Sequence, residues 1–142
     1  MIDSSFSPVA GKRADIMDLV LDGAIREQLH RVAASEQIVR SKRLVRFLRF
    51  TVEKALEGQP DALTEYSIGI AVYDRPADFD PFTDGIVRTE VHRLRSKLRQ
   101  YYQGAGRSDA ILIDYPIGSY IPQFSPASPE FLPKTGIVAP LL

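Results

Sequence analysis

The residues best suited to chemistry are concentrated in one segment, IVRTEVHRLRSKLRQYY at residues 86–102. At helical spacing this segment has an apolar face and two polar rows of side chains. The row about 110° from the apolar face consists of Arg88, His92, Arg95 and Arg99. The row at about 210°, nearly opposite the apolar face, consists of Thr89, Arg93, Ser96 and Gln100. Such donors can bind phosphate oxygens and the edges of DNA bases.

We expect these polar residues to divide between two kinds of DNA contact. Arg93 and Thr89 point away from the core, so they are predicted to reach base edges, and replacing Arg93 should cost little stability. The row of Arg88, His92, Arg95 and Arg99 is predicted to contact phosphates. Ser96 and Lys97 complete the predicted interface on this helix. The alternative for the whole segment is a basic surface that is only solvated.

Glu90 leaves two interpretations open. Its carboxylate could accept a hydrogen bond from a cytosine, or it could pair with Arg93 three residues later on the helix. His92 is predicted to be a polar surface residue, because no second histidine or cysteine is placed to make it a zinc ligand.

The formal net charge of the 142-residue chain is zero, but its charges are unevenly distributed. Residues 40–54 and residues 85–107 each contain six Lys or Arg and one Glu, a local charge of +5. Residues 55–84 contain one Arg and seven Asp or Glu, a local charge of −6. The two basic blocks favour a DNA partner, whereas the acidic stretch 55–84 slightly favours a protein partner.

Several other classes of protein and site are disfavoured. The absence of cysteine excludes disulfides and a cysteine nucleophile and indicates a cytoplasmic protein. Asp78, Asp80 and Asp84 cluster, but their spacing does not fit an EF-hand and helix capping explains them, so no metal is predicted. We find no nucleophile–base pair, phosphate loop or paired-carboxylate cleft, so neither an enzyme, a cofactor nor a small-molecule substrate is predicted. No apolar run approaches the roughly 18–20 residues that span a bilayer.

Three further helices and a hairpin are expected around the basic helix, which is assigned to residues 84–103. A helix is predicted over 15–34, with Gly23 leaving open whether it is one helix or two. A second begins at the N-cap Ser41 and stops at Gly58. A third, short and apolar almost all round, follows the N-cap Thr64. Gly69 in its middle costs about 1 kcal/mol relative to alanine, which suggests that another backbone passes close by.

After the basic helix the apolar period changes to that of strands. Two strands are predicted, over 110–115 and 119–124, around a turn at 116–119. The folded unit is therefore expected to be one domain of residues 15–124. Residues 1–14 are expected to be disordered, and residues 125–142, with four prolines, to form a flexible tail.

The order of these elements defines a fold class. A helix, a short buried helix, a loop, a long basic helix and a β-hairpin form a mainly α fold with a small hairpin (α+β), a winged helix-turn-helix. The long helix, 84–103, fits a major groove. The hairpin, 110–124, can act as a wing that touches the adjoining backbone or minor groove through its turn residues Ile117, Gly118 and Ser119.

Two stretches carry a resemblance to a known family. VRTEVHRLRSKL followed by ILIDYPIGSYIPQF resembles the recognition helix and wing of OmpR/PhoB-type effector domains. The chain is closer still to a winged-helix domain found at the N-terminus of bacterial signalling proteins that often carry tetratricopeptide or propeller sensor repeats. Its matching motifs are SKRLVRFLRF, LTEYSIGIAVYDRPADFDPFTDGIVRTEVHRLRSKLRQYY and IGSYIPQF. Ser119 stands where the wing turn of the first family has a second glycine.

The resemblance implies sequence-specific binding of double-stranded DNA in transcriptional control, with a homodimer on DNA as one arrangement. The alternative is a winged-helix module that contacts protein within a signalling system and does not bind DNA, because a fold alone does not fix a function.

Overall fold

The computed structural model describes the backbone of residues 8–127 and the side chains of residues 20–127. Its elements, in chain order, are α1 (Pro8–Ala33), α2 (Lys42–Leu56), the 3₁₀ turn η1 (Pro60–Ala62), α3 (Glu65–Tyr73), α4 (Ile86–Gln103), β1 (Ile111–Asp114) and β2 (Gln123–Pro126). The two strands form one antiparallel sheet. The chain therefore has the small, mainly helical α+β fold that the sequence predicts.

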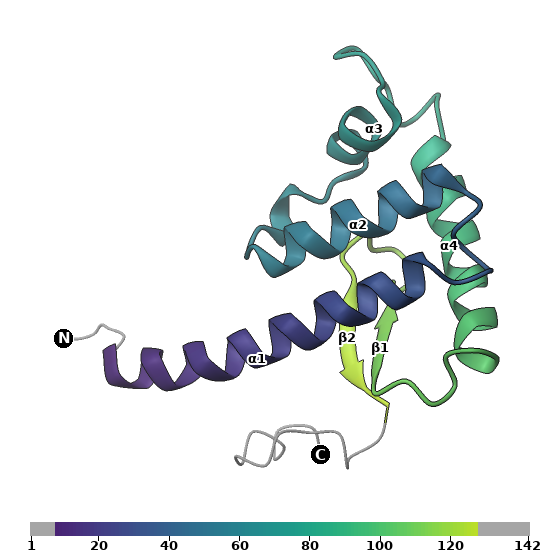
Figure 1. The fold of residues 1–142 in the computed structure, drawn as a ribbon. Helices are drawn as coiled ribbons and strands as arrows, with labels where there is room; N and C mark the ends of the chain where they lie inside the picture. The colour runs from purple at the N-terminus through teal and green to yellow at the C-terminus, as the bar shows by residue number, and fades with distance from the viewer. Residues whose placement is uncertain (1–7, 128–142) are drawn as a thin grey trace.

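The helices surround the hairpin on several sides. Figure 1 shows α1 and α2 side by side, with the hairpin behind them and α4 at one end of the pair. α3 lies beyond α2 and packs against both α2 and α4, and β1 contacts α1 and α4. The N-terminal half of α1 extends past the rest of the molecule (Figure 1).

The apolar face predicted for the basic helix is confirmed. Its five members, Val87, Val91, Leu94, Leu98 and Tyr101, are all buried and belong to the single hydrophobic core of the described residues. Complete burial of one face fixes the rotation of α4 about its axis, so the two polar rows must face outward or toward neighbouring elements.

Local capping chemistry sets the predicted starts of two helices. The Ser41 hydroxyl accepts from the Leu44 amide at 3.2 Å and begins α2. The Thr64 hydroxyl accepts from the Ser67 amide at 3.1 Å and begins α3. Each hydroxyl satisfies one amide that the first helical turn leaves without a partner.

α1 is longer than the sequence indicates. It runs without a break through Gly23 and begins at Pro8, so residues 8–14, expected to be disordered, are helical. Proline suits a first helical position because its φ is already helical and its missing N–H would have no intrahelical acceptor there. The expectation for residues 1–7 lies outside the described residues.

The neighbour of Gly69 is a side chain and not the backbone that was expected. A Cβ at this position would overlap the ring of Phe79, whose Cδ2 would lie 2.8 Å away. Phe79 is buried and stacks on Tyr66 with 6.2 Å between the ring centroids. The glycine therefore admits the loop that connects α3 to α4.

The hairpin differs from the prediction in its second strand. The turn forms at 116–119, where the Ser119 amide donates to the Pro116 carbonyl at 3.1 Å. Pairing nevertheless starts only at Gln123, which lies opposite Asp114, and continues to Pro126 opposite Ile111. The strand is therefore not 119–124, and the predicted tail is ordered at its start.

The late start of β2 and its extension to Pro126 each have a backbone cause. Pro122 has no N–H to donate, and the carbonyls of the turn are bound by a side chain of α4, described below. In a two-stranded sheet each strand is an edge, so Pro126 can sit in β2 with its nitrogen outward. The expectation of a flexible tail at residues 128–142 lies outside the described residues.

Candidate nucleic-acid interface

The predicted interface residues of α4 all lie off its buried face. The exposed ones are Arg88, Thr89, His92, Arg93 and Arg99, and the half-buried ones are Arg95, Ser96 and Lys97. Their side chains nevertheless have unequal access to a ligand, because three of the four arginines already contact protein groups.

Arg88 is paired with the first turn of α3. Its Nη1 donates to Glu65 Oε2 at 2.6 Å, and half of the arginine side chain remains exposed. The pair joins the N-terminal turns of α3 and α4, and its carboxylate offsets the charge that was predicted to bind phosphate. Glu65 had no assigned role in the sequence, since the two residues lie 23 positions apart.

Arg95 binds the wing turn. Its Nε donates to the Tyr115 carbonyl at 2.7 Å, and its Nη2 donates to the carbonyls of Pro116 at 3.0 Å and Ser119 at 3.4 Å. Three of its five N–H groups are thus occupied by the backbone of the turn. Arg95, assigned to phosphate contact from its row, instead fixes the wing turn against α4.

The turn itself presents an apolar tip. Ile117 is 92% exposed, and Gly118 has a φ of 86°, which favours glycine at this position. At its base, the buried Tyr115 hydroxyl lies 2.5 Å from the Thr51 hydroxyl of α2. The wing is therefore anchored at its root to α2 and along its turn to α4.

A cleft of about 280 Å³ separates the turn from α4. Its lining residues are Arg88, Val91, His92, Arg95, Gly118, Ser119 and Tyr120. Of its three side chains with nitrogen donors, Arg95 is bound to the turn and Arg88 to Glu65, which leaves His92 without a partner among the described residues. The structure therefore brings part of the predicted interface together at this cleft, and the predicted residues that do not line it are Thr89, Arg93, Ser96, Lys97, Arg99 and Ile117.

Arg93 and Glu90 form an ion pair across one helical turn. Arg93 Nη1 lies 3.1 Å from Glu90 Oε2 and 3.3 Å from Oε1, which resolves the two interpretations of Glu90 in favour of the pair. Glu90 is only 3% exposed, whereas the Arg93 side chain is 46% exposed. Arg93 thus neutralises a buried carboxylate through one end nitrogen, while nearly half of its side chain stays exposed.

The pair borders a polar atom that has no partner. The Tyr73 hydroxyl is buried and, among the described residues, makes no hydrogen bond. Burial first, and then the negative charge of Glu90, raise the pKa of Tyr73 well above its ordinary value. Tyr73 is therefore neutral at physiological pH and offers Glu90 no compensating charge, which leaves that role to Arg93.

Lys97 and Arg99 differ from the other cations of α4. Within residues 20–127 neither makes a hydrogen bond or an ion pair, and the same holds for His92. His92 and Arg99 are exposed on one face of α4, seven residues apart, whereas the half-buried Lys97 lies roughly 150° around the helix from them. These three side chains are available for an anionic ligand at no cost in internal contacts.

The acidic loop before α4 supports the first turn of the helix, which begins at Ile86 and not at residue 84 and has Gly85 at its N-cap position. Asp84 accepts from the Ile86 amide at 3.1 Å and pairs with Arg75 at 2.7 Å. The hydrogen bond from Arg75 is the main cause that lowers the pKa of Asp84. Asp80 accepts from the Phe82 amide at 3.0 Å. In the part of the chain that the structure describes, no group of three His, Asp or Glu side chains could hold a metal.

The second basic segment, on α2, is partly engaged. Arg46 pairs with Asp74 at 3.2 Å and donates to the Ala71 carbonyl at 3.1 Å, which ties α2 to the end of α3. One helical turn on, Arg49 makes no such contact among the described residues.

Comparison with known proteins identifies no relative: no protein-family model, no curated protein and no solved structure matches this chain. In the described residues, no helix has the length and apolarity required to cross a membrane.

Proposed function

We propose that this chain is a sequence-specific DNA-binding transcriptional regulator with a winged helix-turn-helix fold. In this arrangement α3 supports α4, α4 enters the major groove and the β1–β2 hairpin acts as the wing. α4 has 18 residues and is about 27 Å long, enough to follow the groove over several base pairs.

The observation that carries the proposal is that α4 buries one face in the core, exposes polar and basic side chains elsewhere, and has the wing attached to it. One face of α4 is entirely buried, which holds the helix rigidly. The outer faces present Lys97 and Arg99 without internal partners among the described residues, and the guanidinium of Arg95 binds the carbonyls of the wing turn that carries the exposed Ile117. A rigid helix with an attached, fixed turn suits a duplex better than a flexible ligand.

We assign different roles to the residues of the predicted interface according to the contacts that each side chain makes. His92, Lys97 and Arg99 are the phosphate ligands, since they have no competing partner. Arg93, held by Glu90 and half exposed, is with Thr89 the base-reading residue. Arg95 positions the wing and does not itself bind the duplex.

A specific observation also favours the protein-interaction alternative. Arg88, Arg93 and Arg95 are engaged with protein oxygens, so the field of α4 is weaker than its sequence charge suggests. The chain as a whole also has a net charge of zero, so it has no overall attraction to DNA. The second candidate is therefore a winged-helix module that binds a protein partner and not DNA.

The experiment is selection of a preferred duplex from a random pool, followed by titration of variants on that duplex and on a scrambled one. Arg99→Ala should weaken binding to both duplexes alike. Arg93→Ala is made in a Glu90→Met background, with Glu90→Met alone as its reference, so that no buried carboxylate is left unpaired. It should cost about 1–3 kcal/mol on the preferred duplex only.

Two results would contradict the proposal. The first is a pool from which no preferred sequence emerges. The second is a loss for the Arg93 variant that is equal on both duplexes, as for Arg99→Ala. Arg107→Ala is the matched control, because Arg107 is exposed in the loop after α4 and lies outside the interface.

A further inference from the structure

The tip of the wing is apolar and carries no charged side chain. Between Asp114 and Gln123 the hairpin reads YPIGSYIP, without a Lys, Arg, Asp or Glu. Ile117 is 92% exposed and Ile121 is 36% exposed. At Ile117 the fold therefore gains almost nothing from burial of the side chain, and its apolar surface is left for a ligand.

The backbone that carries Ile117 is held in one shape. Gly118 has a φ of 86°, and no other residue of the turn has a positive φ. The Ser119 amide donates to the Pro116 carbonyl at 3.1 Å, so residues 116–119 form a type II turn with Ile117 second. Arg95 binds the carbonyls on both sides of the tip, at 3.0 Å for Pro116 and 3.4 Å for Ser119. A single exposed isoleucine is ordinary on a protein surface, but this one has a fixed direction.

An uncharged tip suits one part of a duplex better than another. Phosphates are bound most strongly by Lys and Arg, and the cation that reaches the turn, Arg95, is already bound to its carbonyls. The minor groove, about 6 Å wide, instead accepts apolar side chains such as isoleucine, which partly unstack a base step and kink the duplex. The tip is slender as well, since a Cβ at Gly118 would meet no atom within 4 Å.

We propose that Ile117 inserts between two base pairs from the minor groove and bends the DNA that α4 holds. This inference rests on the proposed function and specifies the contact that the wing makes. Pyrimidine–purine steps are the easiest to unstack, so Ile117 favours such a step at the position that it reaches. The wing thereby adds sequence preference without a hydrogen bond to a base.

The experiment measures affinity and bend together, on the duplex that the full chain selects from a random pool. Energy transfer between dyes at the two ends of the duplex reports the bend. A fluorescent adenine analogue, placed at successive steps beside the site of α4, reports unstacking. We expect the wild type to bend the duplex by about 20° or more and to unstack one step. Ile117→Ser should abolish both signals and raise the dissociation constant about tenfold, because the apolar contact is lost.

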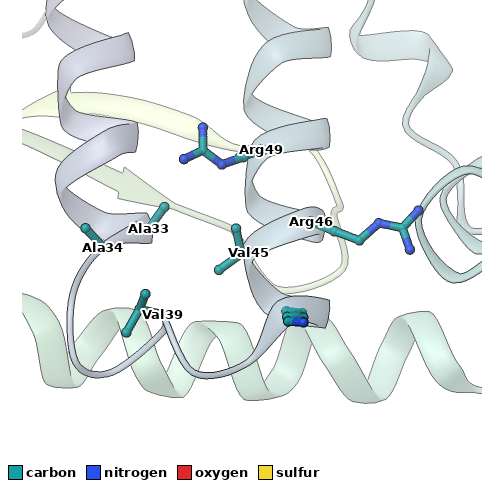
Figure 2. Close-up of a pocket in the computed structure, with 7 residues that line it drawn as sticks. Ala33, Ala34, Val39, Val45, Arg46 and Arg49 are labelled. Carbon is teal, nitrogen blue, oxygen red and sulfur yellow. The ribbon is translucent and has the colours of Figure 1, made fainter.

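Three further variants separate the side chain from its support and from a general loss of apolar surface. Ile117→Leu keeps an apolar side chain of similar size and should keep the bend. Arg95→Ala leaves Ile117 in place but frees the turn, so the bend should decrease. Val39→Ser is the matched control and should change neither signal. Val39 is 48% exposed, and Figure 2 shows it on the loop between α1 and α2, beside a groove that no wing residue lines.

Thermal unfolding of each variant checks that the fold is kept. A selected duplex that the wild type binds but leaves straight overturns the inference, while the proposed function stands. An equal bend with Ile117→Ser also overturns it, since α4 alone then sets the bend. Unchanged affinity and bend for that variant would leave the exposed isoleucine to a protein partner. A wild type that binds no duplex overturns both the inference and the proposed function.

Discussion

Replacement of Arg93 by alanine should destabilise the fold, although the side chain is half exposed and the sequence alone predicted little cost. The reason is its partner: Glu90 is 3% exposed, and within the described residues Arg93 supplies its only ion pair. Truncation leaves a buried carboxylate without compensation, and the neutral Tyr73 hydroxyl nearby carries no positive charge to replace it.

The magnitude follows from the geometry of the pair. Leaving a buried hydrogen-bonding group unsatisfied costs about 1–3 kcal/mol, and breaking a fully buried ion pair costs about 3–5 kcal/mol. Because 46% of the Arg93 side chain is exposed, solvent screens the pair, and the lower range applies. We expect Arg93→Ala to lower the free energy of unfolding by about 1–3 kcal/mol, less than the about 2–5 kcal/mol expected of a core truncation such as Leu94→Ala.

Urea unfolding at neutral pH measures this effect. Arg93→Ala, Glu90→Met and the double variant are compared with the wild type, and Arg99→Ala serves as the control because its side chain has no partner among the described residues. The double variant should be more stable than Arg93→Ala alone, since it leaves no unpaired charge. Arg93→Ala within about 0.5 kcal/mol of wild type, as for an ordinary surface change, would refute the reasoning.

Three further predictions concern other contacts. Arg95→Ala should release the wing turn and increase amide hydrogen exchange in residues 116–122, with unchanged exchange in α4; a protected turn would show that other contacts hold it. Asp84→Asn should lower stability at neutral pH. Arg75 lowers the pKa of Asp84 below its ordinary value of 3.8, so the stabilisation is present above that value and is lost as the pH falls through the lower folded pKa. Thermal melts of the wild type and this variant should therefore converge in acid, and a constant difference would contradict the assignment. Gly69→Ala should destabilise by about 1–3 kcal/mol in thermal melts, because its Cβ overlaps the Phe79 ring, and a neutral effect would mean that the ring moves aside freely.

The sequence predicted features that depend on neighbours within a few residues. The buried stripe of α4 follows from the 3.6-residue period, and the caps at Ser41 and Thr64 follow from hydroxyls that reach an amide three residues on. The change from helical to strand period also located the hairpin. Each of these signals lies inside a single element.

Contacts between elements were not predicted. Arg95 was predicted to bind phosphate because helical periodicity gives the direction of its side chain but not the neighbouring group that it meets. The carbonyls that it binds lie 20–24 positions away in the sequence. The partner of Gly69 and the late start of β2 depend in the same way on segments brought together only by folding. The pair of Arg93 and Glu90 was within reach of the sequence, but the burial of Glu90 was not.

The most direct test of DNA binding is the affinity of the wild type for random duplex DNA, measured by fluorescence anisotropy from low to physiological salt. Lys97 and Arg99 each displace about one condensed cation when they bind phosphates, and each contributes about 0.9 to the slope of log affinity against log salt. We predict a negative slope of about 2 or steeper, reduced by about one unit in Arg99→Ala and unchanged in Arg107→Ala. No binding at low salt, or an affinity that does not change with salt, would contradict the proposal that α4 faces DNA.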